Sequence, residues 1–198
     1  MFSALFILAF SILVALGSPV PSRSCGVTSY GPFRLYAATG GSSDSQLVRL
    51  VKTGVDSNKN TISTMTTCES CGDAPAYWTL NDSVLTPVFF AVDDDVTTVN
   101  MPLTQGKVNF VTGPSDTLVK FASYCAVRSS STGGGLPGYL AVNGDAENFS
   151  VCSFIGTPGP AHRRDIYYAQ GSTPIANHCQ PVHLIMQSIG IIPEPIPA

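Results

Sequence analysis

The sequence predicts an all-β protein, built as a single antiparallel β-sandwich or a small β-barrel with disulfides. Three observations favour this class. The apolar stretches are short, and several alternate with period 2, which is typical of strands with one buried face. Residues that form turns recur every ~8–12 positions, as they do in sandwiches and barrels. No window shows the 3.6-residue apolar repeat of an amphipathic helix.

An uncharged apolar run covers residues 4–17 and ends in Ala15-Leu16-Gly17. Small residues at the first and third of these positions fit a signal peptidase site, so residues 1–17 are predicted to be a secretory signal peptide. The alternative is an uncleaved membrane anchor. A spanning helix needs about 20 apolar residues, and Ser18 and Pro19 end this run earlier. We therefore expect an extracellular, secreted protein.

The chain after the signal peptide is long enough for one domain with a sizeable core. We divide it into an extended segment at 18–32, a single all-β domain at 33–187 and a Pro-rich C-terminal tail at 188–198. Charged residues make up 12% of the sequence, and the formal net charge is −3. Such a chain has no basic footprint for nucleic acid or for an anionic membrane, so neither is an expected partner.

Strands are expected throughout the domain. In chain order they cover residues 33–37, 46–52, 61–67, 77–80, 84–92, 96–103, 107–111, 118–127, 139–142, 149–155, 166–169 and 181–186. A polar turn at 81–83 predicts a hairpin between 77–80 and the strand after it. Asn143-Gly144-Asp145 predicts a second hairpin. If such hairpins repeat, a β-trefoil-like fold is the alternative.

Alternation also predicts which side chains face inward. Trp78, the only tryptophan, shares a strand face with Leu80, so we expect its indole in the core. Tyr77 points to the opposite face and is expected to be exposed. An exposed ring there could stack on a sugar, which makes Tyr77 the candidate ligand-binding residue; the alternative is packing against a loop. In 118–127, the same reasoning places Val119 and Cys125 on one inward face.

All six cysteines follow the predicted signal peptide, and an even number in a secreted chain indicates three disulfides. They are Cys25, Cys68, Cys71, Cys125, Cys152 and Cys179. Sequence alone leaves the pairing open, although a local Cys68–Cys71 bridge is favoured. A redox-active pair would need a helix N-terminus in a βαβ context. A zinc site with His178 or Cys179 would need a second ligand pair. We expect no metal and no cofactor.

Two sequons and one dibasic pair are candidate modification sites. Asn81-Asp82-Ser83 and Asn148-Phe149-Ser150 match the N-glycosylation pattern, so Asn81 and Asn148 are candidate acceptors. The second lies beside Cys152, where a glycan has less room. Arg163-Arg164 lies in an expected loop, where a secretory processing protease could cut; a solvated loop is the alternative.

No catalytic residue can be assigned from the sequence. There is no Gly-x-Ser-x-Gly elbow, and the glutamates number only three, Glu69, Glu147 and Glu194. Glycoside hydrolysis needs two carboxylates that flank the bond, and aspartates could supply them. Asp93-Asp94-Asp95 could contribute to a calcium site only with help from another loop, so a solvated turn is favoured.

Four stretches of the chain resemble a known group of proteins: PFRLYAATGG, CESCGDAPAYWTLNDSVLTPV, GYLAVNGDAENFSVCSF and CQPVHL. The group consists of small secreted, cysteine-containing proteins of basidiomycete fungi, which are largely without assigned function. The resemblance covers most of the mature chain. It implies a fungal protein that is extracellular or associated with the cell wall, and it brings no catalytic residues.

Two functions follow as hypotheses. The first is a secreted, non-enzymatic β protein that is associated with the cell wall or binds extracellular ligands, with polysaccharide or wall components as partners. The second is a secreted hydrolase that acts on wall polysaccharide through converging aspartates. Two carboxyl groups about 5–10 Å apart across a groove would favour the enzyme.

Overall fold

The computed structural model describes residues 25–39, 44–90, 95–103, 105–128, 137–153, 163–169 and 178–190. Within these ranges every regular element is a β-strand and every strand pairing is antiparallel. The all-β prediction is therefore confirmed. The segment predicted to be a signal peptide and most of the predicted C-terminal tail lie outside the described residues.

Most strands are short, as expected of a chain with frequent turn residues, and β1 and β14 are the longest with 10 residues each. They are β1 (Tyr30–Thr39), β2 (Ser45–Leu47), β3 (Arg49–Val55), β4 (Thr61–Thr66), β5 (Tyr77–Asn81), β6 (Val84–Val88), β7 (Val96–Asn100), β8 (Gln105–Lys107), β9 (Asn109–Pro114), β10 (Tyr124–Arg128), β11 (Pro137–Val142), β12 (Phe149–Ser153), β13 (Arg164–Ala169) and β14 (Cys179–Ser188).

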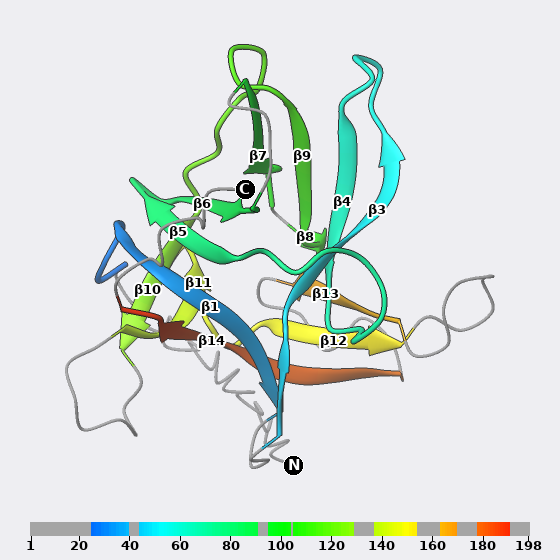
Figure 1. Ribbon diagram of the computed structural model, residues 1–198. Coiled ribbons are helices and arrows are strands. Elements are labelled where there is room, and N and C mark those ends of the chain that lie inside the picture. Colours follow the sequence, from blue (N-terminus) through cyan, green and yellow to red (C-terminus); the bar gives the residue numbers. More distant parts are fainter. Residues whose placement is uncertain are drawn as a thin grey trace, which may run out of the picture.

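The strands form one sheet that curves into a nearly closed barrel (Figure 1). Its main path runs β6-β5-β1-β14-β12-β13-β4-β9-β7. The long strand β14 is shared: its first residues pair with β12, and the rest pairs with β1 from Val182 to Ser188. β11 pairs with both β10 and β14, while β2, β3 and β8 extend β1, β4 and β13. The barrel form of the predicted fold is the one observed.

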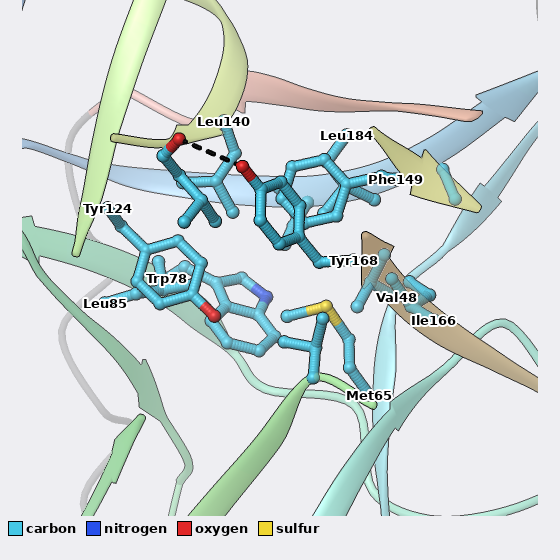
Figure 2. Packing of buried hydrophobic residues seen from close by; sticks show 14 of the residues in the cluster. Val48, Met65, Trp78, Leu85, Tyr124, Leu140, Phe149, Ile166, Tyr168 and Leu184 are labelled. Atoms are coloured by element: carbon cyan, nitrogen blue, oxygen red, sulfur yellow. Dashed lines mark hydrogen bonds between the residues drawn. The ribbon is translucent and has the colours of Figure 1, made fainter. Parts of the chain in front are cut away.

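The inner face of the sheet carries a single large apolar core. Alternate residues of each strand point inward, and those of β1 illustrate it, because Phe33 and Leu35 are both fully buried. Figure 2 shows the centre of this core, where Trp78 lies among Leu85, Tyr124 and Met65. The indole is only 1% exposed and meets the ring of Phe110 edge-on at 5.5 Å. The expected burial of Trp78 is confirmed.

All six cysteines are paired, as predicted. The bridges are Cys25–Cys125, Cys68–Cys71 and Cys152–Cys179. The first joins the segment before β1 to β10 and the third joins β12 to β14. The local Cys68–Cys71 bridge is the one favoured from the sequence. It also rules out these two thiols as ligands of a zinc site in this oxidised form.

The expectation of one strand over 46–52 is wrong. The chain pairs with β1 as β2, then crosses at Val48 and pairs with β4 as β3. Val48 is fully buried at this crossing, and its N–H donates to the carbonyl of Leu35 at 2.9 Å. Periodicity cannot reveal the crossing, because the alternation of buried side chains continues through it. β3 then reaches Val55 through a bulge before Gly54.

Residues 118–127 also differ from the expectation. The strand begins only at Tyr124, and Val119 is 66% exposed instead of inward-facing. The N–H groups of Ser123 and Tyr124 both donate to the carbonyl of Ser83, which directs the chain into β10. Cys125 is fully buried as expected, but it lies in a smaller cluster with Val127, Ala141 and Ala146.

The first expected hairpin is present and the second is not. β5 and β6 are joined through Asp82 and Ser83, whose φ values of 47° and 67° give the primed turn that favours hairpins. β11 and β12 instead separate after a tight turn, in which Val142 and Asp145 exchange two backbone hydrogen bonds of 2.9 Å. β11 joins β10, and β12 joins β13. Of the two hairpins that suggested the trefoil alternative, only the first is therefore formed.

Candidate functional site

The inner face of β3, β4 and β9 changes character along the strands. Leu50 and Phe110 belong to the apolar core. Two residues further along β3 and β9, on the same face, stand Lys52 and Thr112. Ser63 of β4 lies on this face as well, opposite Lys52 of β3 and Phe110 of β9. The core thus gives way to a surface of hydroxyl groups at this end of the barrel.

A row of threonines crosses this surface. Thr61 of β4 pairs with Thr112 of β9, and Thr112 pairs with Thr98 of β7. The Oγ1 atoms of Thr98 and Thr112 share a hydrogen bond of 2.8 Å. Each hydroxyl can both donate and accept, so the row offers either role to a ligand.

A groove lies over this hydroxyl-rich surface. One of its walls comes from the loop closed by the Cys68–Cys71 bridge. Leu50 and Asp73 exchange backbone hydrogen bonds of 2.9 and 2.8 Å, which fix this loop against β3. Between them lies Gly72, with a φ of +71° and no room for a side chain, since a Cβ would stand 2.1 Å from the oxygen of Leu50. Asp73 and Ala74 then line the groove.

The other wall is aromatic. Phe89 and Phe90 follow directly after β6 and both line the groove. Phe89 packs against the core, whereas Phe90 is 64% exposed. The groove between the two walls has a volume of about 560 Å³. This lies within the range of about 300–1,000 Å³ that is usual for small-molecule sites. Barrel mouths are also common positions for such sites.

The groove is close to neutral and rich in hydroxyls. Its charged lining residues in the described part of the chain are Lys52 and Asp73. A glycosidase of the usual kind needs a pair of carboxyl groups, and the described lining supplies one. No cluster of three His, Cys, Asp or Glu side chains that could hold a metal occurs within the described ranges. Of the acidic run considered for calcium, only Asp95 is described, and it is exposed.

Tyr77 does not line this groove. Its ring is half-buried on the face of β5 opposite to Trp78, beside Val88 of β6. The groove residues were seen in the sequence only as members of strands or turns. The signal that could have revealed them is the apolar Phe89-Phe90 pair just past a strand end, where alternation stops.

The two sequons are placed differently. Asn81 is exposed at the end of β5. Asn148 is half-buried, and its Nδ2, the atom that would carry a glycan, donates a hydrogen bond to Asp145. Asn81 is therefore accessible to a glycosylating enzyme, whereas the Nδ2 of Asn148 is already hydrogen-bonded within the fold.

The dibasic pair is not a solvated loop. Arg164 is the first residue of β13 and pairs with Ser153 of β12. Its carbonyl accepts hydrogen bonds from Thr66 Oγ1 at 2.7 Å and from the N–H of Thr67 at 3.0 Å. Arg163 binds the fully buried carboxylate of Asp165 at 2.8 Å, and Lys107 binds it at 2.9 Å. A protease that requires an extended, unpaired substrate would have to unfold this strand.

Nothing matches the chain in comparisons with protein-family models, with curated proteins or with solved structures. Across the described residues, no helix has the length and apolar character needed to traverse a bilayer.

Proposed function

We propose that this chain is a secreted, non-enzymatic β protein that binds neutral extracellular polysaccharide, such as that of a cell wall, in the groove between the threonine row and Phe90. The observation that supports this most is the combination of hydroxyl groups on the floor with an exposed aromatic ring on the wall. Sugars present hydroxyls at their edges and apolar C–H groups on their faces. A surface of this composition complements both.

Secretion is part of the proposal. Three disulfides are typical of oxidising compartments, and the uncharged apolar run at residues 4–17 has the form of a signal peptide. We expect N-terminal sequencing of protein from culture medium to begin near Ser18. Protein retained in membranes with an intact Met1 would contradict this part.

Binding can be measured by depletion of the folded protein from solution by insoluble cellulose, chitin or β-1,3-glucan. Phe90→Ala removes the exposed ring, and we expect affinity to fall about 10-fold, which corresponds to about 1.4 kcal/mol. Val119→Ala is the matched control, because Val119 is equally exposed but does not line the groove. Equal losses in both variants would contradict a specific site.

A second pair of replacements tests the hydroxyl floor. Thr98→Val combined with Thr112→Val keeps the shape and removes both partners of one hydrogen bond, so neither is left unsatisfied. We expect unchanged melting temperature and weaker retention on polysaccharide. Release of soluble sugar from any of these polymers by the purified protein would overturn the non-enzymatic assignment.

A further inference from the structure

A second hollow opens on the inner face of the barrel, away from the groove. β4 runs from Thr61 in the groove to Thr66, whose hydroxyl contacts the start of β13. Beyond that point, the end of β1, the middle of β12 and the starts of β13 and β14 surround a cavity of about 190 Å³, together with β2 and the residue before it. This is the volume of about six liquid waters, on the order of one sugar ring.

The floor of this hollow is apolar and its rim is polar. Ala37, Val151 and Val182 are buried and form the floor. Around it stand Thr39, Asp44, Gln46, Arg164 and Gln180. The rim therefore combines a hydroxyl, a carboxylate, two carboxamides and one guanidinium, while the floor offers a surface for C–H groups.

Arg164 gives the hollow its specific chemistry. On β13 it shares a face with Ile166 and Tyr168, both of which are core residues, so alternation directs its side chain along the inner face into the hollow. Within the described part of the chain, no ion pair of Arg164 is found, in contrast to Arg163, which binds Asp165. A guanidinium presents paired N–H donors that match the two oxygens of a carboxylate.

Asp44 limits which other groups a ligand can carry besides a carboxylate bound to Arg164. Its negative charge in the same small hollow disfavours a ligand with two charges, such as phosphate near neutral pH. A carboxylate has about four lone-pair positions, so Asp44 can accept a hydrogen bond from a ligand hydroxyl in addition to its existing contact. The rim thus favours one carboxylate carried on a hydroxylated body.

We propose that this hollow binds a single uronic-acid unit, with its carboxylate on Arg164 and its hydroxyls on Asp44, Gln46 and Gln180. The site is separate from the groove for neutral polysaccharide and does not depend on it. The carboxylated sugar could be a free monosaccharide or the end of an acidic polysaccharide, and both present the same chemistry to the rim.

Calorimetric titration of the folded protein with glucuronate and galacturonate tests the proposal, with glucose, acetate and phosphate as comparison ligands. We expect at least one uronate to bind at least about 10-fold more tightly than all three comparison ligands. The assignment would be overturned if phosphate, acetate or glucose bound as tightly as both uronates. Because the hollow holds one unit, a uronate trimer should bind no more than about 10-fold more tightly than the monomer; a larger gain would contradict the single-unit site.

Arg164→Met keeps most of the side-chain length and removes the charge, while the backbone hydrogen bonds of β13 remain. We expect uronate affinity to fall about 10-fold or more. Arg34→Met is the matched control, because Arg34 is exposed on β1 and does not line the hollow. If Arg164→Met fails to fold, Gln180→Leu at the exposed rim should still lower affinity about 3-fold. Unchanged affinity in the folded Arg164 variant, or in the Gln180 variant if only that one folds, would contradict the proposal.

Discussion

The side chain of Asn100 joins β7 to Leu85 of β6. Its Oδ1 accepts a hydrogen bond from the backbone N–H of Leu85 at 3.2 Å, and its Nδ2 donates to the carbonyl of Phe121 at 2.8 Å. β6 and β7 are the two ends of the main strand path, and no backbone ladder connects them. One fully buried carboxamide therefore takes the place of a strand pairing at the seam of the barrel.

Replacing Asn100 by Leu should destabilise the protein markedly. The change keeps a similar volume but leaves the Leu85 N–H and the Phe121 carbonyl without this partner. A buried polar group without a partner costs about 1–3 kcal/mol, so we expect a loss of about 2–5 kcal/mol in urea unfolding. Asn58→Leu, in an exposed turn, should change stability by less than about 0.5 kcal/mol. Similar effects at both positions would contradict the role of the seam.

Two buried tyrosines should respond in opposite ways to loss of the hydroxyl. Tyr168 OH donates to the carbonyl of Val142 at 3.4 Å and to Asp145 at 3.3 Å (Figure 2 shows the first), whereas Tyr124 OH has no partner among the described residues. Tyr168→Phe should cost about 0.5–1.5 kcal/mol, while Tyr124→Phe should be neutral or stabilising. Thermal unfolding at pH 7 compares them directly. A larger loss for Tyr124→Phe would show that its hydroxyl has a partner after all.

Because of the same two tyrosines, we expect the folded protein to lose stability at alkaline pH. Burial raises the pKa of Tyr124 and of Tyr168 above the ordinary value of 10.0, and the nearby Asp145 raises the pKa of Tyr168 further. The fold therefore favours the neutral phenols. Their contribution is complete below the unfolded pKa of 10 and is lost as pH rises beyond it, by about 1.4 kcal/mol per pH unit for each tyrosine. In the double Phe variant the decline between pH 10 and 12 should be shallower. Equal slopes would show that other groups dominate.

The disulfides should differ in their contribution according to the length of chain they close. Cys25–Cys125 spans 100 residues, Cys152–Cys179 spans 27 and Cys68–Cys71 spans 3. Chain-entropy estimates give about 5, 4 and 2 kcal/mol respectively. Paired Cys→Ser variants, unfolded in urea, should follow this order. Loss of Cys68–Cys71 should also weaken polysaccharide binding, because that bridge closes the loop that carries Asp73. Unchanged polysaccharide binding in this variant would show that the loop does not contribute to the binding site.

Trp78→Ala should cost about 3–5 kcal/mol, the usual loss for a buried aromatic side chain. Tyr77→Ala, one residue earlier but half-buried on the opposite face, should cost about 1 kcal/mol. The two melting temperatures provide the measurement. Retention on polysaccharide adds a second result: the groove site predicts normal binding for Tyr77→Ala, and reduced binding would restore Tyr77 as a ligand contact.

Glycosylation should occur at Asn81 in preference to Asn148. Asn81 is exposed, whereas Asn148 uses its Nδ2 in a hydrogen bond to Asp145. Peptide mass spectrometry after enzymatic removal of glycans from secreted protein identifies the occupied residue. Full occupancy of Asn148 would show that the Asp145 contact yields to the glycan.

The local features of the fold could be predicted because neighbouring residues determine them. Alternation in β1 identifies Phe33 and Leu35 as core residues, and the spacing of Cys68 and Cys71 permits their bridge. Long-range choices could not. The crossing at Val48 keeps the alternation intact while the partner strand changes, and β11 turns away from β12 because β10 and β14 provide its partners. The groove was missed for the same reason, since Thr61, Thr98 and Thr112 meet only through the sheet.

The pairing of β1 with β14 has a consequence for the time order of folding. Phe33 lies opposite Ser188, and Thr39 lies opposite Val182, so the central ladder of the barrel joins segments that are made at very different times during synthesis. Ladders between such distant segments form slowly, because closing the long loop between them costs conformational entropy before any stabilising contact forms. The early strands must therefore wait, with an apolar face uncovered, until β14 has emerged. We expect folding intermediates of this protein to need chaperone protection for longer than those of a barrel built from consecutive hairpins.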